Sequence, residues 1–141
     1  MINAITTNLI TPDLIKSHDF YCNKLDFKVI FSVDYNGKTL TTVDEKTVFI
    51  AIWNPENPDN MLFLQDLKWY EEDLWVSATK SWESNLYINV DSIENYIKIC
   101  EENNIKILMW PRKTFYGTKE ILIKDNLWNN LVLAEMIEQP Q

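Results

Sequence analysis

The hydrophobic positions of this chain follow a strand-like period and then a helix-like period, and this order occurs twice. The first copy opens with the apolar stretch "AITTNLI", and the second opens with "NLYINV". A helix is expected after each stretch, because apolar side chains then recur at helical spacing. These side chains are Leu14, His18, Tyr21 and Leu25 in the first copy, and Ile93, Tyr96, Ile97 and Cys100 in the second.

The two copies align at an offset of 79 residues through the helices and of 78 residues after one deletion, which indicates an internal repeat. Thr6 corresponds to Asn85, and Leu14 corresponds to Ile93. Each copy reads strand, helix and three further strands, so we expect one α+β domain over residues 1–141 built from two tandem β-α-β-β-β modules. Module one is assigned to 1–53 and ends with a strand at Thr47–Trp53, a connection containing a helix follows over 54–82, and module two covers 83–138.

Local signals place the helix starts and one hairpin. Thr11 is expected to accept hydrogen bonds from the first-turn amides of the first helix, and the second helix is expected to open at Asp91. The Asn36-Gly37 pair lies between two strand-like runs and predicts a two-residue turn, because such a turn needs positive φ at both central positions.

Composition and charge narrow the classes of partner. The net charge is −8 and the pI is near 4.6, which opposes binding to nucleic acid and favours cationic small molecules near any cleft. No apolar run approaches the ~20 residues that a membrane-spanning helix needs, and the start lacks the pattern of a secretory signal. We therefore expect a cytoplasmic protein that binds neither nucleic acid nor a membrane, with Cys22 and Cys100 as reduced, packed thiols.

Two motifs carry a family resemblance. Phe20-Tyr21 is followed by Leu25-Asp26-Phe27, and Gly117 opens a hairpin whose turn reads "DNLWN", with Trp128 where a glycine is usual. In this order the motifs resemble those of the vicinal oxygen chelate superfamily, which includes glyoxalases, bleomycin resistance proteins and dioxygenases. The resemblance implies that both modules form a cupped, roughly eight-stranded mixed sheet with a ligand site in the cup.

The resemblance also locates the metal ligands of the metal-dependent members. Carried over to this chain, those positions fall on Thr6, about Phe49, Asn85 and Val132. None of these side chains is a carboxylate or an imidazole, which a divalent ion needs to replace its hydration shell. We expect no metal and no cofactor, and we place His18 on a helix outside the cup.

Strand alternation assigns the residues that face into the cup. A slip of one residue in the strand at Thr47–Trp53 would exchange its inward set for Val48, Ile50 and Ile52, whereas Glu135 is assigned to the face opposite Val132. Trp53 and Trp110 are expected to be equivalent in the repeat and to stack on a ligand. The predicted ligand-binding residues are Thr6, Asn8, Phe49, Trp53, Asn85, Tyr87, Trp110 and Val132.

Three functions remain open from the sequence. The resemblance is strongest to the metal-free bleomycin-resistance branch, which implies a homodimer that sequesters a cationic, aromatic antibiotic, helped by the acidic run from Asp66 to Asp73. The second is a metal-free lyase or isomerase-type enzyme acting on a small metabolite or a glutathione adduct. Against it, no inward-facing Asp, Glu or His is expected, and Tyr87 alone is a poor base. The third is an enzyme with a metal site built from other residues, such as Glu83 or Glu135.

Overall fold

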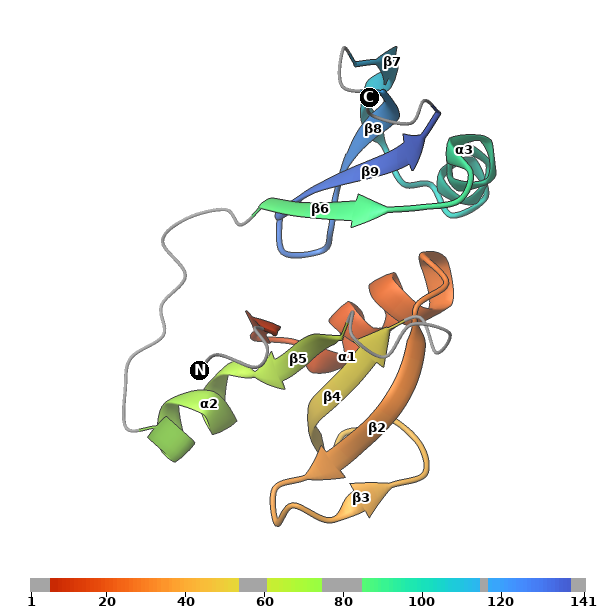
Figure 1. The fold of residues 1–141 in the computed structure, drawn as a ribbon. Coiled ribbons are helices and arrows are strands. Elements are labelled where there is room, and N and C mark those ends of the chain that lie inside the picture. Colours follow the sequence, from red (N-terminus) through yellow and green to blue (C-terminus); the bar gives the residue numbers. More distant parts are fainter. Residues whose placement is uncertain (1–5, 54–60, 75–84, 115–116, 138–141) are drawn as a thin grey trace. The chain divides into compact units, whose positions relative to one another are not determined.

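The computed structural model describes residues 6–53, 61–74, 85–114 and 117–137. The chain divides into two compact units, 1–79 and 80–141, and each unit contains one mixed β-sheet and its own helices (Figure 1). The predicted α+β class is therefore confirmed, and the expected strands are divided between a five-stranded and a four-stranded sheet. None of the described helices is long and apolar enough to cross a membrane.

The first unit contains a sheet of strand order β1-β5-β4-β2-β3. β1 pairs with β5 in parallel, and the other neighbours are antiparallel. Its elements are β1 (Thr7–Thr11), α1 (Leu14–His18), the π-helix η1 (Asp19–Lys24), β2 (Lys28–Asp34), β3 (Thr39–Leu40), β4 (Thr47–Trp53), β5 (Leu62–Asp66) and α2 (Leu67–Leu74).

In its described residues, the second unit repeats this connectivity without a counterpart of β3. Its strand order is β6-β9-β8-β7, with β6 and β9 parallel. Its elements are β6 (Asn85–Asn89), α3 (Ile93–Glu102), β7 (Ile107–Lys113), β8 (Thr118–Lys124) and β9 (Asn130–Met136). Strands β1, β2, β4 and β5 thus correspond to β6, β7, β8 and β9.

This correspondence corrects the assignment of the strand that ends the first copy. The parallel partner of the first strand is β5 at Leu62–Asp66, not the strand at Thr47–Trp53. The segment 54–82 is therefore not only a connection: it supplies a strand to the first sheet, followed by the predicted helix, now α2.

Both helices begin one or two residues later than the sequence indicated. Asp13 caps α1, because its Oδ1 accepts from the Lys16 amide at 3.1 Å, whereas the Thr11 hydroxyl accepts from the Asp13 amide. Ser92 caps α3 in the same way and accepts from the Asn95 amide. In each helix, a short polar side chain closer to the first turn, Asp13 or Ser92, therefore forms the cap.

The two turns with unusual residues also differ in detail from the sequence expectation. Of the Asn36-Gly37 pair only Gly37 has positive φ, and the Asp34 amide donates to the Lys38 carbonyl, so this turn is one residue longer than predicted. Trp128 has a φ of 64°, the left-handed conformation that its usual glycine would adopt. Buried Asp125 maintains that turn by accepting from the Leu127 and Asn129 amides, both at 2.8 Å.

The core of each unit lies between the helices and one face of its sheet. In the first unit α1 packs against β4 and β5, and in the second α3 packs against β7, β8 and β9. Each fully buried aliphatic side chain stabilises its unit by about 1.5–3 kcal/mol. These side chains are Leu25, Ile50, Ile52 and Leu64 in the first unit, and Ile93, Ile121, Ile123 and Leu131 in the second.

Candidate functional site

The strand register shows which residues share the face of the first sheet opposite its helices. Asn8 pairs with Phe63, Phe63 with Ala51, and Ala51 with Phe31, so these four lie in one row across the sheet. Phe49 pairs with Gln65 in the next row on the same face. Phe49 and Ala51 therefore share the face of Asn8 and Phe63, and the alternative residues Ile50 and Ile52 lie on the other face.

Three phenylalanine rings from neighbouring strands form a continuous surface on this face. The centroids of Phe31 and Phe49 are 6.0 Å apart with an interplanar angle of 27°, and those of Phe49 and Phe63 are 4.9 Å apart at 59°. Phe31 is 40% exposed, and the other two rings are half-buried. We call this set the aromatic face.

A pair of amide side chains adjoins the aromatic face. The Asn8 Nδ2 atom donates to Gln65 Oε1 at 2.8 Å. Gln65 is buried, whereas Asn8 is exposed. The bond fixes the orientation of the Asn8 amide beside Phe63, with its carbonyl oxygen as a hydrogen-bond acceptor.

The corresponding face of the second sheet is ionic. Val132 pairs with both Tyr87 and Leu122, and Glu120 pairs with Arg112. Leu122 and Glu120 are two residues apart on β8, so all five side chains share the face opposite α3. We call Tyr87, Arg112, Thr118 and Glu120 the ionic face.

Glu120 is the centre of the ionic face. It is 1% exposed, and its carboxylate accepts from the Tyr87 hydroxyl at 2.5 Å, from Arg112 Nη2 at 3.2 Å and from the Thr118 hydroxyl at 3.2 Å. The expectation that no carboxylate lies on this face is therefore wrong. Alternation along "TKEILIK" carried the signal, because Ile121 and Ile123 belong to the core face and thereby put Glu120 on the other.

The two tryptophans selected as stacking residues are not equivalent in the fold. Trp53 lies on β4, which corresponds to β8, whereas Trp110 lies on β7, which corresponds to β2. Trp53 is on the same face as Phe49 but is only 3% exposed, so it cannot offer a ring face to a ligand. Trp110 is 58% exposed. The predicted symmetry failed because β5 had been assigned to the connection.

Other predicted residues have defined positions. Glu135 lies opposite Val132, as expected, and its carboxylate accepts from the Ile93 amide at the start of α3. Glu72 accepts from the Tyr35 hydroxyl, and Asp66 accepts from the Trp69 amide at the start of α2, so both have structural partners. Glu83 lies outside the described residues.

The residues at the family's metal positions do not fit a divalent ion. Val132 and its parallel partner Tyr87 correspond to Phe63 and Asn8, so the position assigned to Phe49 belongs to Phe63. The set becomes Thr6, Phe63, Asn85 and Val132, which has no charged or imidazole ligand. Within the described ranges, no group of three or more His, Cys, Asp or Glu side chains is placed to hold a metal.

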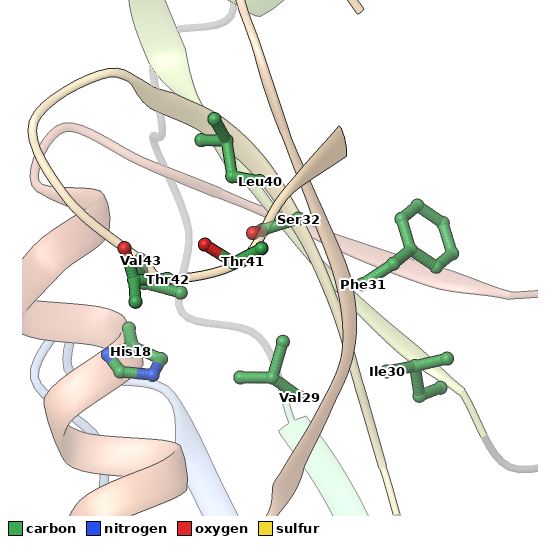
Figure 2. A pocket seen from close by; sticks show the side chains of 9 residues that line it. All are labelled: His18, Val29, Ile30, Phe31, Ser32, Leu40, Thr41, Thr42 and Val43. Atoms are coloured by element: carbon green, nitrogen blue, oxygen red, sulfur yellow. The ribbon is translucent and has the colours of Figure 1, made fainter. Parts of the chain in front are cut away.

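A hollow of about 380 Å³ lies at the β2–β3 edge of the first sheet. Figure 2 shows its lining, in which His18 from α1 lies at one end and Phe31 and Ile30 at the other. Burial lowers the pKa of His18, and the neighbouring Asp19 carboxylate opposes this shift only in part. This shift favours the neutral form of His18, which lines the hollow and belongs to neither of the two faces described above.

The thiols are unpaired and chemically quiet. Cys22 is half-buried and Cys100 is buried, and neither forms a disulfide. Burial raises the pKa of each thiol to about 11, so the reactive thiolate is scarce near neutral pH.

Comparisons with known proteins agree with this geometry. The model of the Glyoxalase/Bleomycin resistance protein/Dioxygenase superfamily matches residues 2–132. None of the curated proteins matches the chain in sequence.

Solved structures share the fold at low sequence identity. TioX from Micromonospora sp. ML1 has a TM-score of 0.71 at 10% identity, covering 96% of this chain and 99% of its own. A glyoxalase/bleomycin resistance protein/dioxygenase from Nocardioides has a TM-score of 0.71 at 16% identity, covering 100% and 87%. A lactoylglutathione lyase from Agrobacterium tumefaciens has a TM-score of 0.67 at 13% identity, covering 94% and 92%. Because the family model matches most of its length, the chain belongs to the glyoxalase/bleomycin resistance protein/dioxygenase superfamily.

Proposed function

We propose that the protein binds the planar rings of a cationic aromatic molecule on the aromatic face, without a metal and without altering it. The observation that supports this proposal is the continuous surface of the Phe31, Phe49 and Phe63 rings on the face opposite the helices. Bleomycin is a first ligand to test, because the family model names bleomycin resistance proteins among its members.

The chemistry of the face matches such a ligand. The face of a phenyl ring carries partial negative charge, so it stacks with planar rings and attracts cations. The carbonyl oxygen of Asn8 beside Phe63 can accept from an N–H group of the ligand. A net charge of −8 also raises the local concentration of cations around the protein.

Two further features belong to the same proposal. We expect the protein to work as a homodimer, as the family resemblance implies, and sedimentation velocity of the purified chain measures this directly. We also expect it in the cytoplasm, where its free thiols stay reduced.

The experiment is a titration with bleomycin and with proflavine, a planar cationic tricycle, followed by ligand fluorescence or calorimetry. Acridone supplies a neutral control of similar shape. Saturable binding that Phe49→Leu weakens by about 1 kcal/mol, roughly fivefold, supports the aromatic face. The control Tyr35→Ala removes an exposed aromatic from the β2–β3 turn and leaves the affinity unchanged. Equal affinity for acridone and proflavine would contradict a requirement for positive charge on the ligand. Wild-type affinity for proflavine in Phe49→Leu would contradict binding on the aromatic face.

One observation favours a second candidate, a metal-free enzyme. Glu120 supplies the carboxylate that was thought to be missing, and Tyr87, which donates to it, is 52% exposed. A hydroxyl polarised by a buried carboxylate can exchange a proton with a substrate. Consumption of a glutathione hemithioacetal, abolished by Tyr87→Phe, tests this candidate, and an unchanged substrate concentration argues against it for that substrate.

A further inference from the structure

On the ionic face, the buried carboxylate of Glu120 fixes the position of the exposed guanidinium of Arg112. Arg112 donates to Glu120 through Nη2, and the two residues are direct partners in the β7–β8 register. The Arg112 side chain is 57% exposed, whereas that of Glu120 is 1% exposed. One end of this ion pair is thus inside the protein, and the other is accessible.

Glu120 is not available as a ligand-binding group. One carboxylate oxygen accepts from Arg112, and the other accepts from Tyr87 and Thr118. A carboxylate that is buried and hydrogen-bonded on both oxygens orients its partners. It therefore draws Arg112 and Tyr87, which lie on the two edge strands β7 and β6, toward one carboxylate.

Arg112 retains donors for a further partner. A guanidinium has five N–H donors in a planar fork, and in the described part of the chain Arg112 donates only through Nη2. A planar fork of this kind binds carboxylates and phosphates through two parallel hydrogen bonds. Arg112 is also the only arginine in the sequence.

We propose that Arg112, oriented by Glu120, binds the carboxylate or phosphate group of a small molecule, and that an aromatic or apolar portion of this molecule extends across the ionic face toward Tyr87. This site goes beyond the proposed function and does not depend on it, because it lies on the second sheet. The Arg112–Glu120 pair is neutral as a whole, so recognition depends on the shape of the fork rather than on net charge.

The single arginine gives a specific test. The Nε–H group of Arg112 produces the only arginine side-chain signal of its type in a ¹⁵N-correlated NMR spectrum. Benzoate and phenyl phosphate serve as probes, and benzamide serves as the neutral control. We expect the Arg112 signal to shift saturably with at least one of the two anions and not with benzamide, and the tighter anion identifies the preferred group.

Variants separate a binding site from a structural ion pair. Arg112→Lys keeps the charge beside Glu120 but loses the fork, and we expect it to weaken anion binding about tenfold, read from the backbone amide signals of β7 and β8. Lys113→Gln removes one positive charge from the neighbouring residue on the opposite face and is expected to leave anion binding unchanged. Circular dichroism confirms that each variant is folded.

Three outcomes overturn the proposal: neither anion binds the wild-type protein, Arg112→Lys binds both anions with wild-type affinity, or Lys113→Gln weakens binding as much as Arg112→Lys. The failure of this site is distinguishable from that of the aromatic face. Phe49→Leu is expected to affect proflavine binding alone, and Arg112→Lys to affect anion binding alone.

Discussion

The two sheets have the same connectivity but opposite chemistry on the faces away from their helices. Position by position, Phe49 on β4 corresponds to Glu120 on β8, because Phe49 pairs with Gln65 and Glu120 with Ala134 at equivalent places in the two registers. The first face is an apolar surface of stacked rings, and the second is a hydrogen-bonded ion network. The two units thus share an aliphatic core face and differ on the face away from their helices.

Glu120→Ala is expected to produce the largest loss of stability, in the second unit. It removes a buried side chain together with its ion pair to Arg112 and its hydrogen bonds from Tyr87 and Thr118, which costs about 3 kcal/mol in the free energy of unfolding. Urea denaturation measures this value. Glu120→Gln keeps the shape and one acceptor and should lose less, and a Glu120→Ala protein as stable as the wild type would show that the network is not stabilising.

Phe49→Ala is expected to produce the next largest change, in the first unit. Phe49 contacts both other rings but is only half-buried, so the loss is about 2 kcal/mol, below the usual range for a fully buried phenylalanine. Phe49→Leu retains most of the packing and should cost less than half as much. Equal losses in the two variants, measured by urea denaturation, would contradict this expectation and show that the ring contacts, rather than apolar packing in general, stabilise the unit.

Trp128→Gly is expected to stabilise the protein slightly. A non-glycine residue in the left-handed conformation costs about 1–2 kcal/mol, and the substitution removes this cost. Glycine also has greater freedom in the unfolded chain, which offsets part of the benefit, so we expect the free energy of unfolding to rise by about 0.5–1 kcal/mol. Asp26→Gly is the matched change in the first unit, where Asp26 also has positive φ and pairs with Lys28. Because aspartate tolerates this conformation better, we expect no gain there, and thermal unfolding of both variants tests the difference.

The thiols report on each unit separately, with the smallest expected effect. Cys22 lies in η1 of the first unit and Cys100 in α3 of the second, so Cys100→Ser and Cys22→Ser each leave one reporter. The pKa of each folded thiol, about 11, lies above the ordinary value of 9.0, so their contribution to stability is present below pH 9.0 and lost as pH rises through about 11. Slow labelling by a disulfide reagent at pH 8 that accelerates in urea is expected for both, and fast labelling of native protein would contradict their burial.

The repeat itself was predictable from the sequence because the helical stripes beginning at Leu14 and Ile93 share one offset. β5 was not, because "LFLQD" follows two prolines and gains its meaning as a strand only through parallel pairing with β1, a contact between segments distant in sequence. Without β5, the last strand of the first copy is taken to be β4, so the metal-ligand position of that strand is assigned to Phe49 instead of Phe63.

The candidate site was predictable only in part, because strand alternation gives the face of a residue but not its burial or its partners. Asn8, Phe49 and Tyr87 were assigned to the correct faces by alternation along their own strands. Glu120 was missed because alternation had not been applied to β8, and Trp53 was overestimated because a sequence pattern does not give the burial of an individual ring.

The most direct test of the aromatic face is an NMR titration of protein with ¹³C-labelled phenylalanine rings, using proflavine as the ligand. We predict saturable shifts of the Phe31, Phe49 and Phe63 ring signals, while the signals of Phe20 and Phe27 stay in place because both rings contact Tyr21. Saturable binding that leaves the three ring signals unmoved, or no binding at all, would contradict the proposal that the aromatic face is the binding surface.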